Sequence, residues 1–169
     1  GAASITGSSI IAMAQPRCGD VCLVLVVTCR TVSRRLDSLL RNALKVALEV
    51  EGFDATATVD GREAIRAFRD NSFDVVLLDL ELGEIDGVDA LRQVREIAPN
   101  LKVIVYTSHD EEDYIIQAAE LGVDGYLLKG SPKEEIVGAV RSVNEGGSAI
   151  ESKVAAKLMS HMTKRSAKA

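Results

Sequence analysis

Short apolar runs alternate along this chain with segments whose apolar residues recur at helical spacing, and this alternation constrains the fold most. The apolar runs have the length of strands and cover 21–27, 53–59, 73–79, 101–106 and 123–128. Helical segments are predicted at 33–50, 60–69, 87–98, 111–121 and 131–146. Strands and helices in this order form a parallel sheet through right-handed crossovers, with helices on both faces. We therefore predict an α/β fold with a five-stranded, doubly wound parallel sheet.

Two of the predicted helices carry recognisable start signals. Asp60 and Glu63 have the spacing of a capping box at the start of the second helix. Ser131, Pro132 and Glu134 match the residue preferences of the N-cap, first and third positions of the last predicted helix. These residues predict where both helices begin.

Composition bounds the class of protein. With 169 residues, 47% of them hydrophobic, the chain is long enough for one domain with a substantial core. No apolar run reaches the roughly 18 residues of a membrane helix, so we expect a soluble, cytoplasmic protein without a membrane partner. The three cysteines, Cys18, Cys22 and Cys29, form no CxxC pair and have no histidine nearby, which indicates reduced thiols.

Charge is distributed unevenly along the chain. The net charge is −5, and acidic side chains far outnumber basic ones over 54–151. Residues 152–169 contain five basic side chains and no acidic one. Because proteins that bind nucleic-acid phosphates present a basic face, the acidic body is not expected to bind nucleic acid by itself. The basic tail could bind nucleic acid weakly or could simply be a solvated terminus.

Polar residues end three successive strands of the predicted sheet. Asp79 ends the third strand, Thr107 and Ser108 end the fourth, and Lys129 ends the fifth. Burying a carboxylate costs several kcal/mol unless it is paired or hydrogen-bonded. Because the carboxyl ends of parallel strands line one crevice, we expect a carboxylate, a hydroxyl and an ammonium to converge there.

The sequence around these residues resembles a known family. DLELGEIDG follows the pattern D-L-x-M-P-x-x-D-G of two-component response regulator receiver domains, with Gly83 in place of proline. The resemblance continues through VIVYTS and GVDGYLLKG and covers roughly 53–150. It implies a flavodoxin-like fold. LLKG and VNEGGSAI further resemble the receivers that precede a LuxR-type helix-turn-helix domain.

The resemblance implies a role for each group at the crevice. Asp79 would accept a phosphoryl group from a histidine kinase, Lys129 would pair with the phosphoryl oxygens, and Thr107 would donate a hydrogen bond to one of them. Tyr126 matches the aromatic residue that repositions when the threonine moves. These residues would form a two-state switch.

The resemblance also implies residues that tune hydrolysis and bind metal. Glu81 and His109, each two residues past a site residue, would flank the phosphoryl group. His109 is equally interpretable as a loop histidine. Asp79 and the backbone carbonyl of Glu81 would bind Mg²⁺, together with two acidic residues that receivers normally carry just after the first strand.

The acidic pair is missing from this sequence. Positions 28–30 read Thr28, Cys29 and Arg30, and no Asp or Glu occurs between Asp20 and Asp37. We therefore expect weak Mg²⁺ binding and slow or poorly Mg²⁺-dependent phosphorylation. Two substitutes remain open, namely the carboxylate of Asp37 and a guanidinium from Arg30, Arg34 or Arg35.

The domain organisation follows from these assignments. We expect 1–20 to be a disordered segment or an expression remnant, 21–150 to be the receiver domain and 151–169 to be a basic linker or tail helix. The last segment carries Val154, Leu158 and Met162 as a narrow apolar stripe. Two interpretations of this segment stay open. It could be a linker to a DNA-binding output domain absent from this chain, or a helix that forms a dimer.

The sequence as a whole predicts a signalling phosphoacceptor rather than an enzyme, with self-phosphorylation and autodephosphorylation as its only chemistry. A histidine kinase is the expected partner, with a homodimer as a further candidate. One alternative is a pseudo-receiver, which binds proteins without Mg²⁺-dependent phosphotransfer. Another is a flavodoxin-like enzyme, which TCRTVSRRLD disfavours because it contains no glycine-rich phosphate loop.

Overall fold

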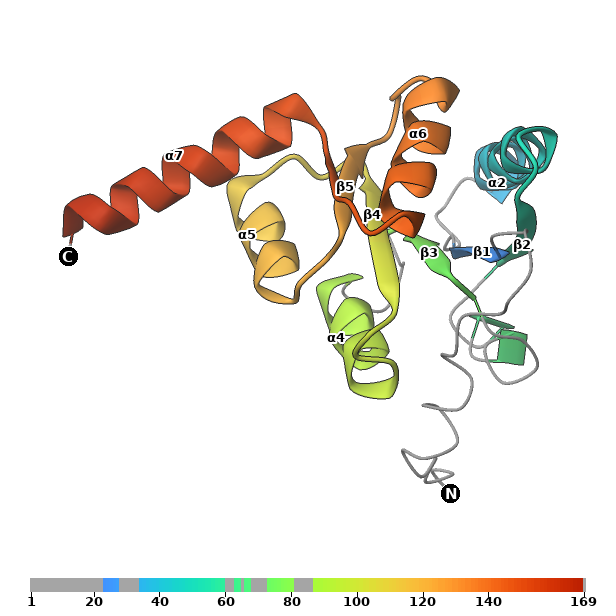
Figure 1. Cartoon of the computed structure of the whole chain (residues 1–169), viewed down its shortest axis with the longest axis horizontal. Helices are drawn as coiled ribbons and strands as arrows, with labels where there is room; N and C mark the ends of the chain where they lie inside the picture. Colours follow the sequence, from blue (N-terminus) through green and yellow to red (C-terminus); the bar gives the residue numbers. More distant parts are fainter. Residues whose placement is uncertain are drawn as a thin grey trace.

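The computed structural model describes residues 23–27, 34–59, 63–64, 66–67, 73–80 and 87–168. The strands are β1 (Leu23–Val27), β2 (Asp54–Thr58), β3 (Val75–Leu78), β4 (Lys102–Thr107), β5 (Gly125–Leu128) and β6 (Ala149–Ile150). The helices are α2 (Arg34–Val50), α4 (Gly87–Ile97), α5 (Glu112–Glu120), α6 (Lys133–Asn144) and α7 (Ser152–Lys168) (Figure 1). The predictions for 1–20 and for Glu81 fall outside the described residues.

All pairs of neighbouring strands in the sheet are parallel, in the order β2-β1-β3-β4-β5-β6. The five predicted strands are confirmed, and the two-residue β6 extends the edge beyond β5. From β2 the chain crosses over β1 to β3, so the strand order reverses beside β1. Ligands of such sheets bind at this reversal, outside the carboxyl ends of the strands.

Helices cover both faces of the sheet. Figure 1 shows α2 and α6 on one side and α4 and α5 on the other. Val75 and Leu77 of β3 belong to the core cluster under α2 and α6, whereas Val76 and Leu78 belong to the cluster under α4 and α5. All four side chains are buried, which confirms that β3 is a strand enclosed on both faces. Each such side chain contributes roughly 1.5–3 kcal/mol by burial.

The start of α6 differs from the prediction. Pro132, with an extended backbone, occupies the N-cap position, and no side chain caps the helix there. The Ser131 hydroxyl donates instead to the Leu128 carbonyl at 2.7 Å and lies 3.2 Å from a Glu151 carboxylate oxygen. The predicted Ser131 cap is therefore wrong, because this hydroxyl is held by the end of β5 and by the residue before α7.

Glu63 does reach back along the chain, as a capping-box glutamate does. Its carboxylate accepts a hydrogen bond from the Val59 backbone N–H at 2.6 Å. The partner is thus one residue before Asp60, and Asp60 itself lies outside the described residues. The capping box remains a prediction for that residue.

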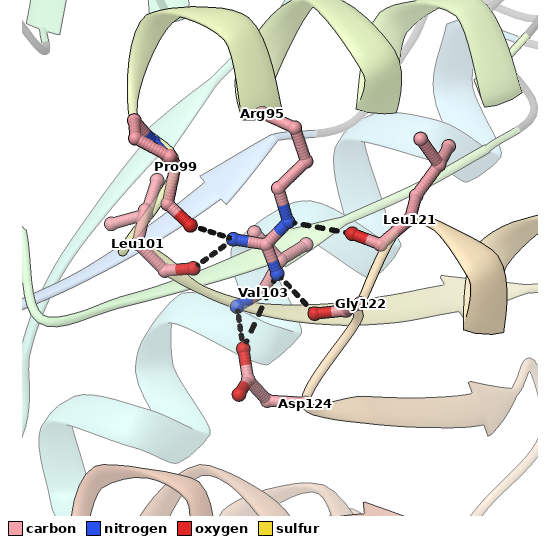
Figure 2. Close-up of polar contacts among 7 residues, drawn as sticks. All are labelled: Arg95, Pro99, Leu101, Val103, Leu121, Gly122 and Asp124. Carbon is pink, nitrogen blue, oxygen red and sulfur yellow. Dashed lines mark hydrogen bonds and ion pairs between the residues drawn. The ribbon is translucent and has the colours of Figure 1, made fainter.

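Arg95, near the end of α4, ties together the amino-terminal ends of β4 and β5 (Figure 2). Its side chain is 14% exposed, and its guanidinium lies 3.5 Å from Asp124 Oδ2. Asp124 also accepts the Val103 backbone N–H at 2.9 Å. The guanidinium donates to four backbone carbonyl oxygens, those of Leu121 at 2.9 Å, Pro99 at 3.3 Å, Leu101 at 2.5 Å and Gly122 at 2.5 Å.

The last helix, α7, extends along α5 and past it (Figure 1). Val154 is fully buried in the cluster under α4 and α5, and Leu158 packs against that cluster. Met162, the third residue of the apolar stripe, is 67% exposed. Two of the three stripe residues, Val154 and Leu158, therefore pack within the chain. Among the described residues, none of the helices combines the length and apolarity needed to cross a bilayer.

Candidate functional site

Asp79 directly follows β3 and meets the residue that follows β5. Its carboxylate is only 4% exposed and lies 2.9 Å from the Lys129 ammonium, which is itself 17% exposed. The intervening strand is β4, so the ion pair spans the carboxyl-terminal edge of three adjacent strands. The geometry brings together the carboxylate and the ammonium that the sequence placed there.

Thr107 is the last residue of β4, and it is fully buried. Its carbonyl accepts the Lys129 backbone N–H at 2.7 Å, which fixes the base of the lysine beside β4. Its hydroxyl oxygen accepts the His109 backbone N–H at 3.2 Å. Thr107 thus lies at the same edge as Asp79 and Lys129, with its hydroxyl bonded to the loop before α5.

Tyr126 connects that loop to β5. Its side chain is buried, and its hydroxyl donates to the His109 carbonyl at 2.7 Å. Burial, with Glu111, Asp110 and Tyr114 adding to it, raises the pKa of Tyr126 far above its ordinary value, so the phenol remains a neutral donor. The His109 backbone therefore links Thr107 to Tyr126 by two hydrogen bonds.

The His109 imidazole lies to one side of this path. It stacks on the Tyr114 ring with centroids 4.4 Å apart, and its Nδ1 lies 3.2 Å from a Glu111 carboxylate oxygen. The ring thus contacts Tyr114 of α5 and Glu111 before it, whereas the His109 backbone bonds Thr107 and Tyr126. Its role in tuning hydrolysis stays a prediction, as does that of Glu81, which lies outside the described residues.

Gly130 makes the turn that follows Lys129. No cis peptide bond occurs in the described part of the chain, so the Lys129–Gly130 bond is trans. Gly130 has a φ of +98°, a conformation that favours glycine. A left-handed glycine therefore makes the turn here.

Tyr106 is a site neighbour that sequence reasoning missed. It is 3% exposed and directly precedes Thr107 on β4. Burial raises the pKa of Tyr106, a hydrogen bond with the Gly130 backbone and the charge of Lys129 lower it, and the charge of Asp79 raises it again. The phenol therefore lies within electrostatic range of both charged groups. Its position at the end of a buried strand indicates a core residue, so the sequence does not mark it as part of the site.

The donor set does not fit the Mg²⁺ site that the family resemblance implies. Val27 of β1 is paired with Leu78 of β3, the residue before Asp79. In the sequence, Val27 is followed by Thr28, Cys29 and Arg30 rather than by two acids. Within the described ranges, no group of three or more His, Cys, Asp or Glu side chains could hold a metal ion. Among the residues that the structure describes, the Asp79 carboxylate is thus not joined by the set of oxygen ligands that Mg²⁺ requires.

Comparison with known proteins agrees with the fold and the motifs. The chain matches the family described as "Response regulator receiver domain" over residues 37–141. It is 36% identical over 118 residues to the response regulator protein VraR of Staphylococcus aureus, an alignment that covers 70% of this chain and 54% of VraR. The chain thus spans about half the length of the curated relatives it matches.

Solved structures show the same architecture. A response regulator from Thermotoga maritima is 28% identical, with a TM-score of 0.63, covering 75% of this chain and 99% of that chain. A LuxR-family two-component response regulator from Aurantimonas sp. has 23% identity and a TM-score of 0.70, covering 85% and 99%, and supports the fold alone. Together with the family match, which spans more than half of the residues, these findings show that the chain belongs to the response regulator receiver family of two-component signalling systems.

Proposed function

We propose that the protein accepts a phosphoryl group from a histidine kinase on Asp79 and thereby switches an output surface. The observation that carries this proposal is the 2.9 Å contact between the Asp79 carboxylate and the Lys129 ammonium at the carboxyl ends of β3 and β5. It is supported by the family, whose members are signalling modules. This cytoplasmic module would undergo self-phosphorylation and autodephosphorylation as its only chemistry.

The proposed reaction needs little from the protein beyond position and charge. An Asp79 carboxylate oxygen attacks the phosphorus, the bond from phosphorus to the donor breaks, and the donor leaves with that electron pair. A carboxylate paired with an ammonium can act as the nucleophile without a general base. Lys129 neutralises charge on the phosphoryl oxygens, and Thr107 would exchange its bond to His109 for one to the phosphoryl group.

The experiment that tests this function is intact mass spectrometry after incubation with a small phosphodonor or a kinase. We expect the unmodified sequence to gain the mass of one phosphate and the Asp79→Asn variant to gain none. Asp89→Asn serves as a matched control, because Asp89 is an exposed carboxylate on α4 whose partner is Arg92. Phosphate on the Asp79→Asn variant would refute the assignment, and no gain on the unmodified chain would favour a pseudo-receiver.

Receiver domains generally bind Mg²⁺ for phosphorylation. Because this chain lacks the acidic pair, we predict that labelling of Asp79 by a small phosphodonor is slow and that a chelator changes its rate little. The measurement is the initial rate of phosphate gain with Mg²⁺ and with EDTA. Fast labelling that disappears with EDTA would contradict the prediction and would mean that other residues complete a metal site.

We propose that 21–150 forms the receiver unit and that 151–169 is a basic linker or tail helix. The curated relatives extend well beyond the matched part, which supports an output domain outside this chain. Binding to DNA would then occur only through that output domain, as the LuxR-family name of one structural relative suggests. A homodimer through the exposed part of α7, where Met159 and Met162 lie on the surface, is a further candidate.

The contacts of α7 connect it to the proposed switch. The Lys157 ammonium lies 3.2 Å from Asp110 Oδ2 and also donates to the Asp110 carbonyl. His161 and Lys164 lie 3.2 and 3.6 Å from carboxylate oxygens of Glu112. Asp110 directly follows His109, whose backbone bonds Thr107 and Tyr126. A shift of Thr107 toward a phosphoryl group would therefore disturb the residues that hold α7.

We predict that Lys157→Ala loosens α7 and that phosphorylation does so too. An exposed ion pair contributes roughly 0.2–1 kcal/mol, so protection of the α7 amides against hydrogen exchange should fall up to about fivefold. Lys153→Ala is the control, because Lys153 is an exposed lysine of the same helix. Equal protection in both variants would show that the Lys157 contact does not hold α7.

A further inference from the structure

Glu151 lies between the short edge strand β6 and the helix α7. Its backbone N–H donates to the Tyr126 carbonyl of β5 at 3.2 Å, which extends the pairing of Ile150 with Tyr126 by one bond. Its carbonyl accepts the Ala155 N–H at 2.9 Å, a helical hydrogen bond at the start of α7. The Glu151 backbone is therefore held by β5 on one side and by α7 on the other.

The Glu151 side chain reaches back to the end of β5. One carboxylate oxygen, Oε2, accepts the Leu128 backbone N–H at 3.0 Å and lies 3.2 Å from the Ser131 hydroxyl. The backbone pairing of β6 with β5 covers only Gly125 and Tyr126, so it does not reach Leu128. A partly buried N–H without a partner costs free energy. The carboxylate therefore supplies an acceptor to β5 where the edge strand has already ended.

The two residues that the Glu151 carboxylate contacts flank Lys129 in the sequence. Leu128 directly precedes Lys129, and Ser131 follows it by two positions. The Ser131 hydroxyl and N–H both donate to the Leu128 carbonyl, at 2.7 and 3.1 Å, which closes the turn 128–131 around Lys129. On the opposite edge of β5, the Lys129 N–H donates to the Thr107 carbonyl at 2.7 Å. The turn is thus held by β4 on one side and by Glu151 on the other.

We propose that Glu151 is a positioning residue of the phosphoacceptor site, which holds the turn 128–131 so that the Lys129 ammonium lies against the Asp79 carboxylate. The proposal rests on the proposed function, because its effect is on phosphoryl transfer to Asp79. Glu151 acts through the turn and not on the phosphoryl group. A charged group contributes most to the rate when it is already in place, so a turn that shifts should lower the rate.

The helix that follows fixes the position of the Glu151 carboxylate. Val154, three residues after Glu151, is fully buried in the cluster under α4 and α5. The first turn of α7 is thereby packed against the domain, and Glu151 directly precedes it. The segment beyond β6 therefore contributes to the site that contains Asp79 and Lys129.

The test compares alanine and glutamine at position 151, with the initial rate of phosphate gain measured by intact mass. Glu151→Ala removes the acceptor and should slow phosphorylation of Asp79 by roughly 3- to 10-fold. Glu151→Gln keeps a side-chain oxygen that can accept the Leu128 N–H, so its rate should return to within about twofold of the unmodified protein. Glu145→Ala is the matched control, because Glu145 is an exposed glutamate at the end of α6, and its rate should be unchanged.

The NMR signal of the Lys129 Cε carbon reports the position of the ammonium without any phosphate transfer. We expect Glu151→Ala to shift this signal and Glu151→Gln to restore it. A purely structural role would lower the melting temperature and leave both the rate and the Lys129 signal of the folded protein at 25 °C unchanged. Ser131→Ala, which removes one contact of the carboxylate, is a milder second variant and should slow phosphorylation by roughly 2- to 3-fold.

An unchanged rate or an unchanged Lys129 signal in Glu151→Ala overturns the proposal, as does a Glu151→Gln variant that is as slow as Glu151→Ala. If Glu151→Ala does not fold, Ser131→Ala with the rate of the unmodified protein overturns it. Failure of the unmodified chain to gain phosphate would instead overturn the proposed function. The Lys129 signal would then still decide whether Glu151 positions the ammonium, so the two failures are distinguishable.

Discussion

Replacing Lys129 with methionine is expected to slow phosphorylation of Asp79 by about 10²- to 10³-fold, the usual effect of removing one preorganised electrostatic partner. Methionine retains most of the lysine stem and removes the ammonium that lies 2.9 Å from the carboxylate. No acidic pair supports a metal ion in this sequence, so Lys129 carries more of the charge neutralisation than in an ordinary receiver. The measurement is the initial rate of phosphate gain by intact mass.

Lys133→Met is the matched control for this experiment. Lys133 is an exposed lysine at the start of α6, four residues after Lys129, and its loss should leave the rate with a small phosphodonor unchanged. A Lys129→Met variant that is phosphorylated as fast as the control would show that the ion pair with Asp79 has no part in phosphoryl transfer. The site would then have to draw its positive charge from elsewhere, such as the arginines that precede or open α2.

Replacing Arg95 with methionine should lower the free energy of unfolding by about 3 kcal/mol, because hydrogen bonds from a charged donor contribute roughly 1.5–3 kcal/mol each. The guanidinium donates to four backbone carbonyls and lies beside Asp124 (Figure 2). Methionine fills similar space and satisfies none of these acceptors. The melting temperature should fall by about 10 °C.

Arg92→Met tests whether the loss of stability comes from the carbonyl contacts of Arg95 or would follow the removal of any arginine from α4. Arg92 lies one turn earlier on α4, is 52% exposed and pairs with Asp89 at 2.6 Å. Such a pair contributes at most about 1 kcal/mol, so the urea midpoint of Arg92→Met should stay close to that of the unmodified protein. Equal shifts in the two variants would contradict the assignment of Arg95 as the connection between α4 and the starts of β4 and β5.

The sequence predicted the sheet well because each strand is a short apolar run with a helix-period segment after it. It missed β6, since Ala149 and Ile150 are too few to form a pattern. The Ser131 cap was wrong because the hydroxyl bonds to the Leu128 carbonyl at the end of β5 and to Glu151, which is distant in sequence. Local preference is readily overridden by such tertiary contacts.

Some residues of the site could be identified from the sequence, and others could not. Asp79 and Lys129 could be identified because strand ends are visible in the sequence and parallel strands bring them together. Tyr106 could not be identified, because the sequence pattern of a tyrosine at the end of a buried strand is that of a core residue. Arg95 was missed for a related reason, as its acceptors are mainly backbone carbonyls, which no residue pattern marks.

A structure of the protein bound to the phosphoryl mimic beryllium trifluoride tests the central claim most directly. The account predicts the mimic on the Asp79 carboxylate, within hydrogen-bond distance of the Lys129 ammonium and the Thr107 hydroxyl. The hydrogen bond that the His109 N–H donates to the Thr107 hydroxyl should be broken. A mimic bound at another carboxylate, or on Asp79 with Lys129 and Thr107 both turned away, would contradict it.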